Sequence, residues 1–265
     1  MEDYSFVFKK SFGQNFLKDE NIVEKIVNCA EIEENSLVIE IGPGAGALTK
    51  KLSKKAKFVL AYEIDTRLET ILDKELINIS NVDIIFDDFL KRDLKNDIEK
   101  YSFEHLYVVA NLPYYITTPI INKLIDEISI DKIVIMIQKE VADRFAALPG
   151  GRDYGSLSVF LNYHFDVKKE FIVKRQNFIP QPNVDSIVIK LTTKKNKLLV
   201  KNEEKFFKLI RDSFKFKRKT LRNNLKGYDL IKIEETLKKY HLDLSVRSEQ
   251  LSLEIFVDIA NNLFD

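Results

Sequence analysis

The chain has 265 residues, of which 45% are hydrophobic and 31% charged, and its 42 Lys and Arg against 41 Asp and Glu give a net charge of +1. Such a chain can bury a sizeable core, which excludes wholesale disorder, a collagen-like repeat and a disulfide scaffold. The single cysteine, Cys29, has no internal partner and suits a reducing compartment. Because the sequence shows no signal peptide and no long apolar run, we expect a cytoplasmic protein without a membrane-spanning segment.

The first 195 residues alternate short apolar runs with helical patterns. We expect strands buried on both faces at 37–41, 58–62, 82–86, 106–110 and 133–137. Helices are predicted at 47–54, 67–76, 120–127 and 139–147. This alternation is typical of βαβ units, so the sequence predicts an α/β protein with a Rossmann-like, mostly parallel sheet.

The later segments predict an antiparallel addition and then a helical domain. Residues 156–165 and 184–191 alternate enough to be antiparallel strands, whereas the prolines at 180 and 182 indicate an irregular loop over 178–182. Residues 194–197 form the expected linker, and helical patterns follow to the end, with Ser252 capping a helix over 253–263. We therefore expect a Rossmann-like domain over 1–195 and a small all-helical domain over 196–265.

Charge is unevenly divided between these two parts. Residues 196–265 hold 15 Lys and Arg against 11 Asp and Glu, a net of +4, which leaves −3 for residues 1–195. Residues 201–226, which we expect to be helical, contain 10 basic residues and three acidic ones. A solvated helix face would explain this run. The other interpretation is an RNA-binding patch for phosphates, made of Lys215, Lys217, Arg218, Lys219 and Arg222.

A glycine-rich turn follows the first strand, with the sequence Gly42-Pro43-Gly44-Ala45-Gly46. Glycines there let the backbone turn tightly and let a ligand approach it. Glu63 ends the next strand, 21 residues after Gly42, where a carboxylate can accept both hydroxyl protons of a ribose. This pattern alone does not separate a nicotinamide cofactor from another adenosine-containing one. The G-x-G-x-G spacing and the preceding Glu40 favour a cationic ligand such as S-adenosylmethionine over a pyrophosphate.

The third strand ends in Asp87-Asp88-Phe89. Asp88 could accept the adenine amino group, with Phe89 packed on the adenine ring. Acidic residues at strand ends also serve as helix caps or surface groups, and we give Asp87 this structural interpretation.

The fourth strand ends in Asn111-Leu112-Pro113-Tyr114, the most specific signal in the chain. The exocyclic nitrogen of adenine is a poor nucleophile because its lone pair is delocalised into the ring. The side-chain oxygen of Asn111 and the carbonyl of Leu112 could accept its two hydrogens and direct the lone pair at a methyl donor. Pro113 would fix the loop and Tyr114 would stack on a flipped base, so positioning carries most of the rate. A proline turn with packed tyrosines is the structural alternative.

Several segments together give a resemblance to a known family. They are Gln14 to Leu17, Glu40 to Gly46, Asn111 to Tyr114, Gln138 to Ala142, Asp153 to Ser158, Phe178-x-Pro180-x-Pro182-x-Val184-Asp185-Ser186 and Arg247-x-Glu249-Gln250-Leu251-Ser252. On these motifs, which run nearly end to end, the chain resembles the ribosomal RNA adenine N6-methyltransferases. It is most similar to the small-subunit methyltransferase A, or dimethyladenosine transferase, family. Tyr115 departs from the family pattern, where Asn is common.

The resemblance implies methyl transfer from S-adenosylmethionine to two adjacent adenosines near the 3′ end of 16S RNA in the 30S particle. It implies cofactor contacts at Asn15, Leu17, Gly42, Gly44, Glu63, Ile64, Asp88, Phe89 and Asn111. It also implies that Asn111 to Tyr114 present the target amine, with Phe178 on the other side of the base.

A resistance-type 23S RNA methyltransferase and a non-catalytic RNA-binding assembly factor are the main alternatives. The sequence shows no separate target-recognition domain, which argues against a DNA adenine methyltransferase. A dehydrogenase function would not explain the Asn-Leu-Pro-Tyr motif. His105, His164 and His241 show no ligand spacing, so we expect no metal site, and we expect a monomer.

Overall fold

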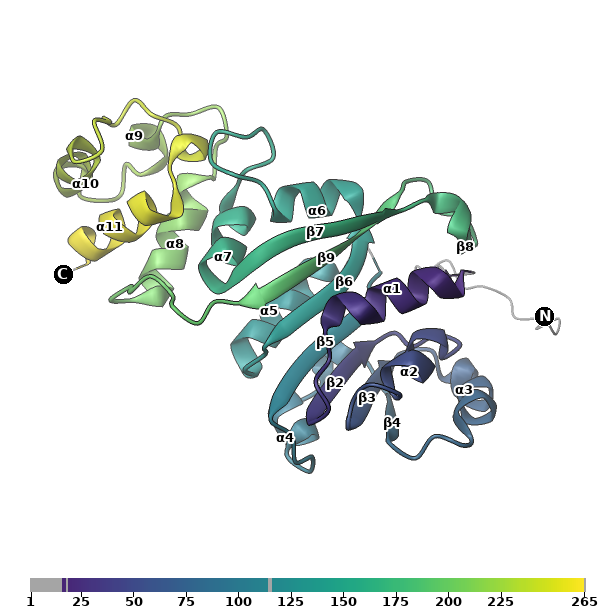
Figure 1. The fold of residues 1–265 in the computed structure, drawn as a ribbon. Coiled ribbons are helices and arrows are strands. Elements are labelled where there is room, and N and C mark those ends of the chain that lie inside the picture. Colours follow the sequence, from purple (N-terminus) through teal and green to yellow (C-terminus); the bar gives the residue numbers. More distant parts are fainter. Residues whose placement is uncertain (1–15, 18, 114–115, 265) are drawn as a thin grey trace. The chain divides into compact units, whose positions relative to one another are not determined.

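The computed structural model describes residues 16–17, 19–113 and 116–264 (Figure 1). The chain divides into two units, one made of residues 1–139 and 168–192 and the other of residues 140–167 and 193–265. The second unit therefore takes in residues 140–167, which we expected in the first domain.

A seven-stranded sheet has the strand order β4-β3-β2-β5-β6-β9-β7. Its strands are β2 (Ser36–Ile41), β3 (Phe58–Glu63), β4 (Val82–Phe86), β5 (His105–Asn111), β6 (Lys132–Gln138), β7 (Phe165–Val173) and β9 (Ser186–Thr193). Strands β2 to β6 pair in parallel, and β9 is antiparallel to β6. The predicted Rossmann-like sheet is confirmed, and each of the five expected parallel strands is present.

The strand order reverses between β2 and β5, because β3 follows β2 on one side and β5 lies on the other. Ile41 of β2 pairs with Tyr62 of β3 and with Ala110 of β5, so these three strands end level with one another. In open α/β sheets, ligands bind at the carboxyl ends of the strands beside such a reversal. The register therefore brings the glycine turn, Glu63 and Asn111 to one edge.

Helices cover both faces of this sheet (Figure 1). Helices α1 (Glu20–Ala30) and α2 (Ala47–Leu52) lie on one face, and α4 (Leu94–Ile98) and α5 (Thr117–Glu127) lie on the other. Short helix η2 (Thr66–Leu68) leads into α3 (Glu69–Leu76), which packs beside β4. The side chain of Asp19 accepts a hydrogen bond from the Asn21 N–H and caps α1. The apolar stripe of α1 is buried against β2, β5 and β6, which fixes that helix beside the strand ends.

The expected strand over 156–165 is wrong, because residues Ser156–His164 form helix α7 and the strand β7 begins at Phe165. Over so short a segment, the alternation of small and apolar residues fits both the two-residue period of a strand and the 3.6-residue period of a helix. Val159 and Tyr163 are four residues apart, and both enter the core of the second unit, which favours the helix. The Ser158 side chain also accepts a hydrogen bond from the Gly155 N–H at the helix start.

The irregular loop expected over 178–182 is only partly present. Residues Phe178–Ile179 form strand β8, which pairs antiparallel with β1 (Phe16–Leu17). The prolines follow directly after this pair, where no ladder hydrogen bond is lost. The second late strand is confirmed as β9.

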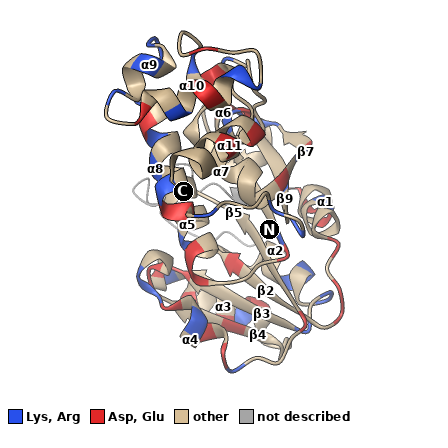
Figure 2. Ribbon diagram, turned by 90° about the vertical axis from the view of Figure 1, so that its left-hand side faces the viewer, with Lys and Arg blue, Asp and Glu red and all other residues tan. Residues whose placement is uncertain are grey.

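The second unit is helical. Its elements are most of α6 (Lys139–Phe145), α7, α8 (Glu203–Ser213), α9 (Leu221–Asn224), α10 (Leu230–Lys238) and α11 (Leu253–Leu263). Helices α7, α8, α10 and α11 share one buried core that includes Tyr163, Phe206, Leu237 and Phe256. Helix α11 has its predicted bounds, but the Ser252 side chain makes no capping hydrogen bond. Lys and Arg gather in the ribbon around α9 (Figure 2).

The helix expected over 201–226 is wrong, because α8 ends at Ser213 and α9 begins at Leu221. Buried Ile210, Leu221 and Leu225 are spaced for one continuous apolar stripe. A continuous helix would place Lys217 or Arg218 on that stripe, and burying an unpaired cation is costly. The chain therefore leaves the helix and carries its cations through a loop.

Among the residues that the structure describes, no helix is long and apolar enough to cross a membrane. Within the same residues, no group of three or more His, Cys, Asp and Glu side chains is placed to hold a metal ion.

Candidate active site

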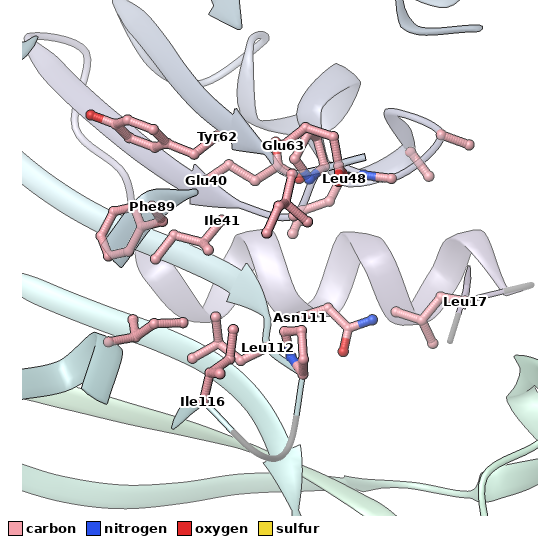
Figure 3. A pocket seen from close by; sticks show the side chains of 18 of the residues that line it. Leu17, Glu40, Ile41, Leu48, Tyr62, Glu63, Phe89, Asn111, Leu112 and Ile116 are labelled. Carbon is pink, nitrogen blue, oxygen red and sulfur yellow. Dashed lines mark hydrogen bonds between the residues drawn. The ribbon is translucent and has the colours of Figure 1, made fainter. Parts of the chain in front are cut away.

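A pocket opens at the carboxyl ends of β2, β3 and β5 (Figure 3). The predicted residues that line it are Leu17, Gly42, Gly44, Glu63, Ile64, Asp88, Phe89, Asn111, Leu112 and Pro113. The structure thus brings together all the predicted cofactor residues that it describes. Asn15 lies outside the described residues.

The glycine turn is held in a left-handed conformation that favours glycine. Gly44 has φ of 60°, and its N–H donates a hydrogen bond to Oε2 of Glu63 at 3.1 Å. Gly46 has φ of 80°, and a Cβ added there would lie 3.3 Å from Cδ2 of Leu72 in α3. The turn is therefore fixed at both ends, by a carboxylate on β3 and by the packing of α3.

Glu63 is 4% exposed and is positioned by main-chain donors on both oxygens. Its Oε1 accepts from the Asp65 N–H at 2.9 Å, while Oε2 accepts from Gly44. Burial raises the pKa of Glu63, and these hydrogen bonds oppose that change. Beside it, Ile64 is 49% exposed and gives the rim of the pocket an apolar side chain.

A second buried carboxyl group, that of Glu40 on β2, also lines the pocket and is 1% exposed. Its Oε2 has no hydrogen-bond partner among the described residues. Burial raises the pKa of Glu40 to about 8; the nearby Thr49 hydroxyl opposes this change, and the negative charge of Glu63 adds a smaller part of it. The described lining also contains Asp87 and Asp88 but no Lys, Arg or His. This charge pattern suits a cationic ligand and disfavours a pyrophosphate.

We expect the wild type to lose folding stability relative to Glu40→Gln as the pH rises from about 5 to 8, and to change little above 8. Glu40 has an ordinary pKa of 4.5 when unfolded but about 8 when folded, so over this range only the unfolded state ionises. Urea unfolding of both proteins across this pH range measures the difference. Parallel stability curves would show that Glu40 does not titrate there.

The two acidic residues after β4 both line the pocket and both have structural partners. Asp88 accepts from the Leu90 N–H at 3.0 Å and so caps the short helix η3 (Phe89–Lys91). Asp87 pairs with Arg92 at 3.3 Å. The structural interpretation of Asp87 fits this pair, and the adenine contact of Asp88 stays a prediction. The Phe89 ring is 5% exposed and meets the Tyr62 ring edge-on.

The loop after β5 is anchored to its neighbours. The Leu112 N–H donates to the carbonyl of Met136 on β6 at 3.2 Å. The carbonyl of Pro113 accepts from the Ile116 N–H at 3.3 Å and from Oγ1 of Thr117 at 3.4 Å. Asn111 and Glu63 lie on opposite sides of the pocket (Figure 3). Tyr114 and Tyr115 lie outside the described residues.

Phe178 is not part of the lining. It is 1% exposed in β8 and packs in the core of the first unit. Its main chain pairs with Leu17, which does line the pocket. Its proposed contact with the target base stays a prediction, and it requires the ring to be uncovered.

A family model described as "Ribosomal RNA adenine dimethylase" matches residues 5–265. The chain belongs to the ribosomal RNA adenine dimethylase family. It is 49% identical to the protein named "Ribosomal RNA small subunit methyltransferase A" in Bacillus pumilus, over 99% of this chain and 94% of that protein. It is 47% identical to the protein of the same name in Streptococcus pneumoniae, with the same coverage.

Solved structures agree with the family assignment. A dimethyladenosine transferase from Plasmodium falciparum has a TM-score of 0.79 and 29% identity, covering 92% of this chain and 95% of that one. The 23S rRNA methyltransferase ErmE has a TM-score of 0.75 and 25% identity, covering 94% and 100%. The predicted family and its methyltransferase fold are thus confirmed for this adenine dimethylase.

Two groups of residues in this dimethylase were missed by sequence reasoning; the first lines the pocket, whereas Asp97 and Arg92 of the second do not. Apolar side chains from α1, α2, α5 and the residue before α5 complete the lining: Val23, Ile26, Leu48, Ile120 and Ile116. Their helical periodicity marks them as apolar positions but does not separate pocket from core. The second group is a network in which Asp97 accepts from the Tyr62 hydroxyl at 3.2 Å and from Nη2 of Arg92 at 2.5 Å. It ties β3 to the loop after β4 and has no local sequence signal.

The predicted RNA-binding patch of the dimethylase lies in the second unit. Lys215, Lys217, Arg218 and Lys219 are exposed in the loop after α8, and Arg222 is exposed on α9. In the described part of the chain none of the five forms an ion pair, and the preceding Asp212 is bound by Lys208 at 2.7 Å. Asp212 and Asp243 interact electrostatically with Lys215 and Arg222 without forming ion pairs, so the patch keeps most of its positive charge, as phosphate binding requires.

Proposed function

We propose that this chain transfers methyl groups from S-adenosylmethionine to N6 of two adjacent adenosines near the 3′ end of 16S ribosomal RNA in the 30S particle. The product would be dimethyladenosine, made by a cytoplasmic monomer during small-subunit biogenesis. Membership of the adenine dimethylase family and the names of its bacterial relatives support this reaction. The observation that carries it is that one pocket combines buried carboxylates with the Asn111-Leu112-Pro113 segment.

The described residues fit S-adenosylmethionine. Glu63 presents a fixed carboxylate suited to the ribose, and Asp88 and Phe89 are suited to the adenine. Buried Glu40 has an unpartnered oxygen in a lining without cations, and a positively charged ligand beside it would favour its ionised form, so it suits the positively charged end. When bound, this cofactor supplies an electrophilic methyl group on a sulfonium centre.

The residues after β5 would act on the target amine. The side-chain oxygen of Asn111 and the carbonyl of Leu112 would accept the two N6 hydrogens, which draws the nitrogen towards tetrahedral geometry. Anchoring of the loop on β6 and α5 supports this role, because acceptors act on a transition state only when they are held in place. No general base needs to act first, since the proton can leave after methyl transfer. The stacking role of Tyr114 rests on the sequence alone.

The test is incubation with labelled S-adenosylmethionine and 30S particles, 50S particles or DNA, followed by mapping of the modified base. We expect label on two adjacent adenines of 16S RNA. Label confined to 50S particles would instead identify a 23S rRNA methyltransferase. The structural similarity to ErmE makes this the alternative to test. RNA binding without transfer to any substrate would indicate a non-catalytic assembly factor.

Replacing Arg218, Lys219 and Arg222 by Ala should weaken RNA binding and flatten its salt dependence. Removal of one cation that binds a phosphate lowers the slope of log affinity against log salt concentration by about one unit. Filter binding or fluorescence anisotropy across a salt series measures that slope.

The matched control replaces Lys54, Lys55 and Lys57 by Ala. These three lysines are exposed in the turn before β3, at the end of that strand away from the pocket. The control removes the same charge, so its slope should stay that of the wild type. Equal slopes in all three proteins would make the patch only a solvated surface.

A further inference from the structure

The loop between α8 and α9 turns one phenylalanine inward and the next outward. Phe214 is partly buried, and its ring meets those of Tyr154 at 6.0 Å and Phe256 at 5.8 Å between centroids. Phe216, two residues later, is 55% exposed. Such an exposed aromatic side chain gains nothing from the core of its own unit.

The backbone that carries Phe216 is held in place. Its N–H donates to Oδ1 of Asn224 at 3.2 Å, and its carbonyl accepts from Nδ2 of the same residue at 3.3 Å. The carbonyl also accepts from the Lys219 N–H at 2.9 Å. Helix α9 is itself fixed, since the Leu221 N–H donates to the carbonyl of Val246 at 2.7 Å. The ring therefore projects from a loop whose main chain is held in place, so binding has to order only the side-chain torsions of Phe216.

Phe216 is surrounded in sequence by the patch of cations described above. Nζ of Lys215 lies 5.7 Å from the centre of the Phe216 ring. Lys217, Arg218 and Lys219 follow directly and are exposed. An aromatic face between unpaired cations is the chemistry that binds an unstacked base and its flanking phosphates.

We propose that Phe216 is a stacking platform for one unpaired base of the RNA substrate, while the adjacent Lys and Arg hold the phosphates on either side. The inference rests on the proposed function, because it takes RNA as the substrate. The proposed site would give the second unit a preference for unpaired nucleotides. The positive charges alone would bind paired and unpaired RNA alike. Stacking on an aromatic ring tolerates every base, so the site selects single-stranded character and not sequence.

The test compares two fluorescently labelled RNA hairpins, one with a single bulged purine and one fully paired. Phe216→Ala should weaken binding to the bulged hairpin by about 5- to 150-fold and leave the paired hairpin nearly unchanged. Phe216→Trp, which keeps an aromatic face, should retain the affinity. The salt slope of Phe216→Ala should equal that of the wild type, whereas Lys217→Ala should lower the slope for both hairpins.

A bulged 2-aminopurine reports stacking directly through fluorescence quenching, which Phe216→Ala should abolish. Equal affinity of wild type and Phe216→Ala for the bulged hairpin, or an equal loss for both hairpins, overturns the proposal. Methylation of 30S particles by the wild type is measured in parallel. Absence of that methylation counts against the proposed function, whereas the difference between the hairpins tests Phe216 alone.

Discussion

Asn111→Ala should lower the rate of methyl transfer at least about 100-fold, the cost of removing one well-positioned acceptor or donor from a transition state. Asn111 is the last residue of β5 and lines the pocket opposite Glu63. Alanine keeps the strand but removes the oxygen that would accept an N6 hydrogen. Single-turnover transfer from labelled S-adenosylmethionine to 30S particles measures the effect on the chemical step.

The control is Asn96→Ala, an exposed asparagine on α4. It should transfer methyl groups like the wild type. Thermal unfolding should be unchanged in both variants, which separates a missing acceptor from a damaged fold. Near-normal turnover by Asn111→Ala would refute the catalytic assignment.

Glu63→Gln should weaken cofactor binding by roughly 10- to 100-fold, as expected when a hydrogen bond to a charged group is removed. The variant loses the carboxylate that would bind the ribose. It also loses an oxygen that accepts from the main chain of Gly44 or Asp65. Isothermal titration with S-adenosylmethionine measures the change.

Glu69→Gln is the matched control, because Glu69 is exposed at the start of α3. A cofactor analogue without the ribose 2′-hydroxyl separates the two causes. If Glu63 binds the ribose, the analogue should bind wild type and Glu63→Gln with more similar affinities than the parent cofactor does. Affinity of Glu63→Gln for the parent within twofold of the wild type would contradict the assignment.

The parallel sheet and the pocket were predictable because their signals are local. Strands β2, β3, β5 and β6 are short apolar runs with buried residues on both faces, as expected. The expectation is wrong for β4, which lies at the edge of the sheet and has no fully buried residue. The end of each apolar run is visible in the sequence. Since parallel strands end at one edge, Gly42, Glu63 and Asn111 could be brought together without knowing any contact.

The features that sequence reasoning missed depend on distant partners. Helix α7 is decided by Val159 and Tyr163 entering a core formed with helices that follow much later in the chain. Strand β8 exists only because Leu17 pairs with Phe178. The loop after α8 is decided by the cost of burying Lys217 or Arg218, which periodicity does not weigh.

The order in which the chain visits its two units limits how it can be divided. Residues 140–167 belong to the second unit, residues 168–192 return to the first, and residues from 193 belong to the second again. A chain cut after residue 195 would keep Tyr154, Val159 and Tyr163 but lose Phe206 and Phe256, which share their core. The remaining fragment would expose those side chains and tend to aggregate. The helical unit is thus no detachable module, and the enzyme must be made and studied as one chain.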